Sequence, residues 1–334
     1  IMRRKSYIFS MILVLSIIGI DMKGQDPTFS QFYANPLYLN PSLTGSAFSP
    51  RLTLNYRNQW PSLADNFVTY NASYDQYVPD INSSFGIIFN TDRAGSGMIT
   101  TTTVSGLYSY NLKISRNSYI NAGLQGSYYQ RKLDWLNLTF GDMFHPVYGQ
   151  IYPTSEPSPD KYSISFLDFS AGLTYTYRDV FFGGLSVNHL TQPYDGWYND
   201  NSTVLPRKWT LHAGGIFDLE PRTRGRRSME AMTLSPNVLY QQQQNFKQLN
   251  VGLYLNKYPF VVGTWFRHNF ENPDAFIFLL GFQQSSFKLG YSYDITVSKL
   301  KNVTGGAHEI SFTFQFTSPE QSRRKNEPMP CPSF

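Results

Sequence analysis

The sequence carries few charges and a single cysteine. Charged residues make up 15% of the 334 residues, well below the roughly 25% typical of a soluble domain. Cys331 is the only cysteine, which excludes an intrachain disulfide and a cysteine-based metal cluster. The Lys and Arg residues form no stripe interleaved with stacking aromatics, which argues against a nucleic-acid partner. Beyond residue 20, no apolar run reaches the roughly 18 residues that a transmembrane helix needs.

Metal-binding motifs are also missing. The chain has five histidines, but none belongs to a His-Glu-x-x-His motif, and none is spaced from a cysteine or carboxylate as in a zinc site. We therefore expect neither a metal nor another cofactor.

Aromatic residues are the abundant class. They make up 16% of the chain, with 24 Tyr and 26 Phe. Both residues favour strands, and tyrosine also favours the membrane interface. The mean hydropathy of −0.33 is compatible with a membrane protein, because a barrel strand faces lipid only at every second residue.

The N-terminus is typical of a Sec signal peptide. Arg3, Arg4 and Lys5 precede an apolar stretch from Tyr7 to Ile20, which is too short to span a bilayer. We predict residues 1–24 to be the signal peptide, with cleavage near Gly24 and Gln25, and the mature protein to be integral to the outer membrane. No cysteine lies near this junction, so we expect no lipoprotein anchor.

Alternation of apolar and polar residues over about ten positions recurs along the mature chain, as in tilted membrane strands. In 287–298, Phe, Leu, Tyr, Ile and Val alternate with Lys, Gly, Ser, Asp and Thr. The pattern predicts an all-β, antiparallel, up-and-down outer-membrane β-barrel of about 14 strands within residues 51–317, in contact with outer-membrane lipid. The predicted strands are 51–59, 66–77, 83–91, 99–112, 118–131, 167–178, 180–190, 208–219, 232–242, 247–257, 260–270, 275–284, 286–298 and 307–317.

Connection lengths predict the orientation of this barrel. Such barrels have long outer loops and short periplasmic turns. The two longest connections, 132–166 and 191–207, fall on the same side by strand parity, which we take as the outside. Both termini are then expected in the periplasm, with residues 318–334 as a basic tail. The turn at 220–231 is long for the periplasmic side.

Two arginine-rich stretches are expected on the periplasmic side. Each is either a solvated run of charge that fixes orientation or a contact for an acidic periplasmic partner. The residues are Arg222, Arg224, Arg226, Arg227, Arg323 and Arg324.

Ser186 and His189 form the strongest candidate for catalysis, because some outer-membrane barrels hydrolyse lipids with a serine and a histidine. However, the segment 184–188 lacks the final glycine of a nucleophile elbow. Residues three positions apart also point to opposite faces of a regular strand. We therefore expect no catalytic residues and no enzymatic activity.

The segment QDPTFSQFYANPLYLNPSLTGS, residues 25–46, alternates poorly. It is aromatic and contains two Asn-Pro dipeptides, which favour turns and exclude a regular helix. An apolar, turn-rich piece of this kind needs burial. Within residues 25–50 it is predicted to plug the lumen, brace the periplasmic rim or bind a partner, through Phe29, Ser30, Gln31, Phe32, Tyr33, Asn35, Pro36, Asn40, Pro41 and Gly45.

With this segment, an ordered set of motifs resembles the PorP/SprF family of type IX secretion outer-membrane proteins of the Bacteroidota. The matching stretches are QDPTFSQFYANPLYLNPSLTGS at 25–46, GGLSVNHLTQP at 183–193, LPRKWTLHAG at 205–214, YSYDITVSKL at 291–300, GAHEISFTFQF at 306–316 and the terminus from Cys331 to Phe334.

The resemblance implies a non-enzymatic barrel for protein secretion or gliding motility. Its implied partners are type IX components, namely the translocon, the periplasmic ring or peptidoglycan-linked subunits, or a large surface adhesin with a type B C-terminal signal. A core PorP-like role and a cargo-specific SprF-like role both stay open. A porin-like solute channel is the alternative, and a lipid hydrolase is a third hypothesis.

Overall fold

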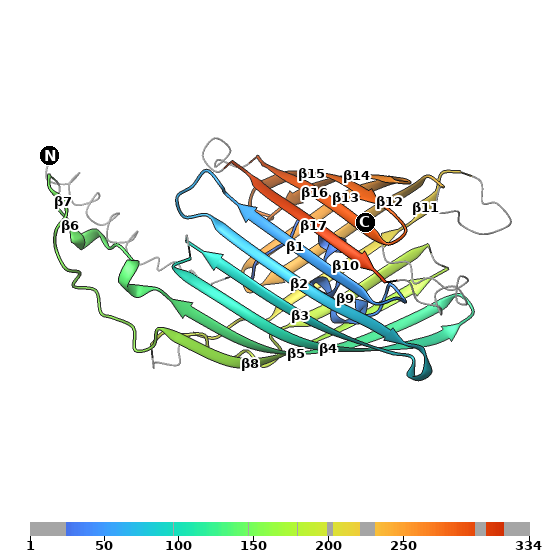
Figure 1. Cartoon of the computed structure of the whole chain (residues 1–334), viewed down its shortest axis with the longest axis horizontal. Coiled ribbons are helices and arrows are strands. Elements are labelled where there is room, and N and C mark those ends of the chain that lie inside the picture. The colour runs from blue at the N-terminus through green and yellow to red at the C-terminus, as the bar shows by residue number, and fades with distance from the viewer. Residues whose placement is uncertain are drawn as a thin grey trace, which may run out of the picture.

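The computed structural model describes residues 25–95, 97–145, 147–178, 180–198, 203–220, 231–297 and 305–316. They form the predicted closed, antiparallel barrel of 14 strands (Figure 1). β1 pairs with β17, and β10 pairs with β12, so the sheet closes on itself. The wall strands are β1 (Arg51–Gln59), β2 (Phe67–Val78), β3 (Ser83–Ala94), β4 (Ile99–Ser115), β5 (Ser118–Leu133), β8 (Ser163–Tyr177), β9 (Phe181–Asn188), β10 (Lys208–Gly215), β12 (Thr233–Gln243), β13 (Phe246–Lys257), β14 (Phe260–His268), β15 (Pro273–Gln283), β16 (Phe287–Thr296) and β17 (Ala307–Gln315).

Apolar and polar residues alternate along the strands of this wall, as the sequence predicts. On β16, Leu289 and Tyr291 are exposed on the outer face, whereas Ser292 and Asp294 are buried inside. The short β11 (Phe217–Asp218) continues the position of β10 against β12. No helix in the described part of the chain is long and apolar enough to cross a membrane.

The two ends of the barrel differ in their connections. At the long-loop end lie the connections 134–162 and 189–207, and at the short-turn end lie 79–82, 116–117, 258–259 and 284–286. The connection 134–162 contains η4 (Trp135–Asn137), η5 (Gly141–Met143), β6 (Phe144–His145) and β7 (Gly149–Gln150), and extends away from the barrel (Figure 1). At 79–82, η3 (Pro79–Ile81) forms the turn.

Strand ends differ from the prediction by a few residues. β8 begins at Ser163, four positions before the predicted 167. β9 ends at Asn188, because His189 has a φ of 57° and leaves the extended conformation. The predicted signal peptide, tail and arginine-rich stretches lie outside the described residues.

Residues 25–50 run through the lumen. Gln25 and Asp26 lie with the inward side chains of the long-loop end, and Pro50 precedes β1 at the short-turn end. Residue 25 and Phe316 therefore lie at opposite ends, which differs from the expectation that both termini share one side. The strand count did not predict this arrangement, because residues 25–50 cross the barrel once more without forming a strand.

Candidate functional site in the barrel lumen

The lumen segment folds into short helical turns separated at its Asn-Pro dipeptides. These are η1 (Phe32–Ala34), α2 (Pro36–Leu39) and η2 (Pro41–Leu43). A proline disfavours helical conformation in the residue before it, so each Asn-Pro ends one turn and starts the next. The Asn40 side chain accepts a hydrogen bond from the Ser42 amide at 3.0 Å and caps η2.

An ionic cluster at Ser30, which we call the Ser30 hub, fixes the segment near the long-loop end. The Glu309 carboxylate accepts hydrogen bonds from the amides of Ser30 at 2.7 Å and Gln31 at 3.1 Å. The Ser30 hydroxyl donates to Asp294 at 2.6 Å. It also accepts from Arg57 at 2.7 Å and from Arg267 at 2.6 Å.

The charges of this hub neutralise one another. Arg57 pairs with Asp294 at 3.0 Å and with Glu309 at 3.1 Å, and Arg267 pairs with Asp294 at 3.0 Å. All these side chains are buried, and they come from β1, β14, β16 and β17. Buried ions are tolerated when paired and hydrogen-bonded, so the hub requires Ser30 and all four charges together.

An apolar cluster follows the hub. Phe32, Tyr33, Leu39 and Leu43 pack with the inward side chains of β9 and β12–β15. Phe32 meets Trp265 edge-on, with ring centroids 5.2 Å apart. The remaining wall members are Phe182, Leu239, Tyr254, Val261, Ile277 and Leu279. The side chains on this side of the lumen are apolar and aromatic, as in the core of a soluble protein, and they bury the aromatic residues of the segment.

The opposite wall receives η2 at glycines, which we call the glycine seat. A Cβ at Gly123 would fall onto the backbone between Pro41 and Ser42, and a Cβ at Gly172 would fall onto the Asn40 side chain. The Asn40 amide also donates to the Leu185 carbonyl at 3.2 Å. The segment therefore fits only where these wall side chains are missing.

A salt bridge holds the end of the segment near β1. The amide of Gly45 donates to Asp75 at 2.7 Å, and Arg51 pairs with the same carboxylate at 2.8 Å. Gly45 has a φ of 73° and faces Ser84 so closely that a side chain would collide with it. Glycine is required there for its conformation and for the space.

His189 fixes the beginning of the segment from outside the strands. Its Nδ1 lies 2.8 Å from Asp168 and its Nε2 lies 2.8 Å from Asp26. Burial alone would lower the pKa of His189, but Asp26 and the hydrogen bond to Asp168 outweigh burial and raise this pKa to about 9. Burial would raise the pKa of Asp26, but His189 and Lys208 hold it well below its usual value.

The serine and histidine considered for catalysis are both buried. The expectation that they face opposite sides was wrong, because His189 lies past the end of β9 and turns inward. The Ser186 hydroxyl donates to the Leu39 carbonyl at 3.1 Å, and both ring nitrogens of His189 face carboxylates. Neither ring nitrogen is available to activate Ser186, so this pair has no catalytic geometry.

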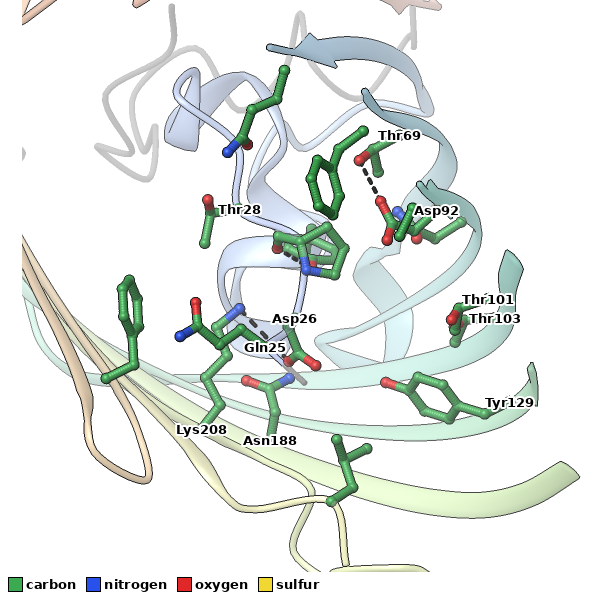
Figure 2. A pocket seen from close by; sticks show the side chains of 18 of the residues that line it. Gln25, Asp26, Thr28, Thr69, Asp92, Thr101, Thr103, Tyr129, Asn188 and Lys208 are labelled. Carbon is green, nitrogen blue, oxygen red and sulfur yellow. Dashed lines mark hydrogen bonds and ion pairs between the residues drawn. The ribbon is translucent and has the colours of Figure 1, made fainter. Parts of the chain in front are cut away.

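A cavity of about 630 Å³ lies in the lumen between the segment and the long-loop end. Figure 2 shows Gln25, Asp26 and Lys208 at one side, with Thr101, Thr103 and Tyr129 at the other. Among the described residues, no group of three His, Cys, Asp or Glu side chains is placed to hold a metal.

The structure gathers all the lumen-segment residues that the sequence singled out. Phe29, for example, packs edge-on against Tyr38 at 5.0 Å, and Asn35 and Pro36 are buried. Sequence reasoning missed the wall partners Arg57, Arg267, Asp294 and Glu309. Asp294 and Glu309 are carboxylates on inward strand faces that otherwise carry few charges. This unusual placement was the sequence signal that could have indicated a buried ionic cluster.

Comparisons with solved structures found chains similar to this one. The structure described as the Ralstonia pickettii toluene transporter TbuX has a TM-score of 0.51 at 9% identity, over 84% of this chain and 93% of that chain. A Pseudomonas aeruginosa FadL homologue has a TM-score of 0.41 at 13% identity, over 83% and 93% of the two chains. At this identity the likeness to TbuX shows only the fold, that of an outer-membrane barrel.

Curated proteins gave no match. The model of a family described as type IX secretion system membrane protein PorP/SprF matches residues 21–314. This span includes the lumen segment and nearly every wall strand, so the match covers the architecture as a whole. The chain belongs to the PorP/SprF family of type IX secretion system membrane proteins.

Proposed function

We propose that this protein is a non-enzymatic scaffold of the type IX secretion and gliding machinery, with a lumen plugged by residues 25–46. Its partners on this proposal are periplasmic secretion subunits, a surface adhesin with a type B C-terminal signal, or both. The single observation that carries the proposal is the ionic Ser30 hub. A segment that is bound inside the lumen through buried salt bridges obstructs the path that an open pore needs.

The position of the segment supports a plug. It contacts β12–β15 on one side and β5, β8 and β9 on the other, so it spans the lumen from wall to wall. Because the segment crosses the lumen, the surfaces left for protein partners on this proposal are the two rims. The connection 134–162 extends the long-loop rim and exposes Leu136, Val147 and Tyr148.

Planar-bilayer conductance tests the plug. We expect the full protein to show no steady open current, and a variant lacking residues 25–46 to conduct. A matched control carries a deletion of similar length in the connection 134–162, which leaves the lumen filled. A steady current through the full protein would contradict the plug.

A separate experiment tests the secretion role. Purification in mild detergent is expected to recover type IX components, and loss of the gene is expected to reduce surface adhesins or secreted cargo. Recovery of an adhesin alone would favour the cargo-specific role, and recovery of ring components the core role. Unchanged secretion together with no recovered component would reject the proposal.

A solute channel is the second candidate, favoured by the cavity at the long-loop end and by the fold shared with TbuX, which its description names a toluene transporter. The cavity ends on the segment, so transport would require the segment to move. Locking the segment with an engineered disulfide between the lumen and the wall separates the candidates. Uptake that persists in the locked protein would reject this channel.

A further inference from the structure

The cavity at the long-loop end has the size of a small-molecule site. Its volume of about 630 Å³ lies within the range that ligand pockets occupy, roughly 300–1,000 Å³. Residues 25–28 of the lumen segment and Tyr38 line it on the inner side, and side chains from β1–β5 line it laterally. The plug therefore shapes the cavity without filling it.

One wall of the cavity presents polar groups in cross-strand rows. Asn90 and Tyr129 both lie opposite Thr103, on either side of β4, and Thr101 lies opposite Asp92 in the next row. Asn90 is buried, and its Nδ2 has no partner among the described residues. In Figure 2 the hydroxyl of Tyr129 points toward the middle of the cavity. This wall offers donors and acceptors to a ligand.

The three cations that line the cavity are each paired with an anion. Arg131 pairs with Asp195, and Lys208 lies 3.7 Å from Asp26. Arg267 is bound within the Ser30 hub. Because each of these cations already has an anion beside it, an anionic ligand gains little attraction here. The polar wall is therefore suited to an uncharged ligand that hydrogen-bonds through many groups.

Aromatic side chains complete the lining. Trp60 and Phe67 meet edge-on with ring centroids 5.5 Å apart, and both line the cavity. Aromatic faces bind the C–H faces of sugar rings, whose hydroxyls point sideways toward polar side chains. One common mode of peptide binding adds a strand to a sheet edge, and the closed barrel of the described residues leaves no free edge for it. The lining thus favours a saccharide over a peptide bound as an added strand.

We propose that the cavity binds a short neutral oligosaccharide, with hydrogen bonds from Asn90, Thr101, Thr103 and Tyr129 and stacking on Trp60. The Asp92 carboxylate, which accepts from Thr69 at 2.7 Å, retains acceptor capacity for a sugar hydroxyl. The site does not depend on which secretion partner binds at the rims. It makes the long-loop end of the barrel a carbohydrate-recognition surface.

The test uses the full protein in detergent and an array of short neutral oligosaccharides, followed by titration of the best hit. Thr103→Val and Tyr129→Phe each remove one hydroxyl with little change of shape. Each is expected to weaken binding about twofold to twelvefold, since a neutral hydrogen bond contributes about 0.5–1.5 kcal/mol. Thr233→Val, a buried threonine on β12 outside the cavity, is the matched control and is expected to leave affinity unchanged.

Each outcome decides the proposal. Folding of every variant is checked by the heat-dependent shift of the barrel on gels, so a lost signal reports binding. A sugar that binds, and whose affinity falls in Thr103→Val and Tyr129→Phe alone, supports the site. No bound sugar on the array, equal losses in Thr233→Val, or binding only of neutral peptides in a parallel peptide array would overturn it.

Discussion

The Ser30 hub and the glycine seat hold the same segment by opposite means. At the hub, the wall supplies charged side chains that reach into the segment. At the seat, the wall has no side chains at Gly123 and Gly172, and the segment occupies the space that side chains there would fill. The ionic hub is sensitive to the loss of a single ion, because Glu309, which pairs with Arg57 alone, would stay buried without a cation. The seat is steric, so its disruption is graded by the volume added.

The largest effect is expected from Arg57→Met. It leaves Glu309 without a cation and Asp294 with Arg267 alone, so we expect a loss of about 3–5 kcal/mol in unfolding free energy and release of residues 25–50. Thermal unfolding in detergent and protease cleavage before β1 measure this. Lys132→Met on the exposed face of β5 is the control. Wild-type melting in Arg57→Met would show that the hub contributes nothing.

A smaller loss is expected at the seat. Gly123→Ala places a Cβ on the backbone between Pro41 and Ser42, and overpacking of this kind costs about 1–3 kcal/mol. Gly106→Ala on the neighbouring β4 adds a Cβ with open space around it and serves as the control. Equal melting temperatures of the two variants would mean that the segment adjusts freely at the seat.

The contacts of His189 with Asp26 and Asp168 form a third anchor of the segment. Their pH dependence distinguishes this anchor from the Ser30 hub and the glycine seat. The pKa of His189 is raised from 6.5 to about 9, so its stabilising contribution is fully present below pH 6.5 and is lost as the pH rises through about 9. Protease cleavage before β1 should therefore accelerate between these values. His189→Gln should remove most of this dependence, and an identical pH profile in that variant would assign it to other groups.

The smallest effect is expected from Ser186→Ala. It removes the hydrogen bond to the Leu39 carbonyl, which corresponds to about 1 kcal/mol. Ser73→Ala, another buried inward serine, is the control in the melting measurement. Lipid products are expected to be the same in Ser186→Ala and in the wild type. A specific loss of lipid products would revive the hydrolase hypothesis.

Local sequence determines the wall but not the contents of the lumen. Alternation and connection length predicted the closed barrel, because successive residues of a strand point to opposite faces, so apolar outward and polar inward residues alternate with a period of two. The segment 25–46 was recognisable as turn-rich and in need of burial. Its actual partners lie far away in the chain, as with Ser30 and Glu309, which are 279 residues apart, and no local pattern links such positions.

The inward turn of His189 illustrates the same limit. Its face was predicted by extending the period of β9 by one residue, but the strand ends at Asn188. A positive φ at a histidine is favoured by contacts, here Asp26 and Asp168, that only the folded barrel provides.

The passage of residues 25–50 through the lumen also decides how the molecule can be labelled. A tag placed directly before Gln25 would emerge among the long connections, whereas a tag following Phe316 would emerge at the short-turn end. Antibody access to the two tags on intact cells therefore reports which rim faces outward. The two tags are expected to give opposite answers, although a strand count alone would place them on the same side.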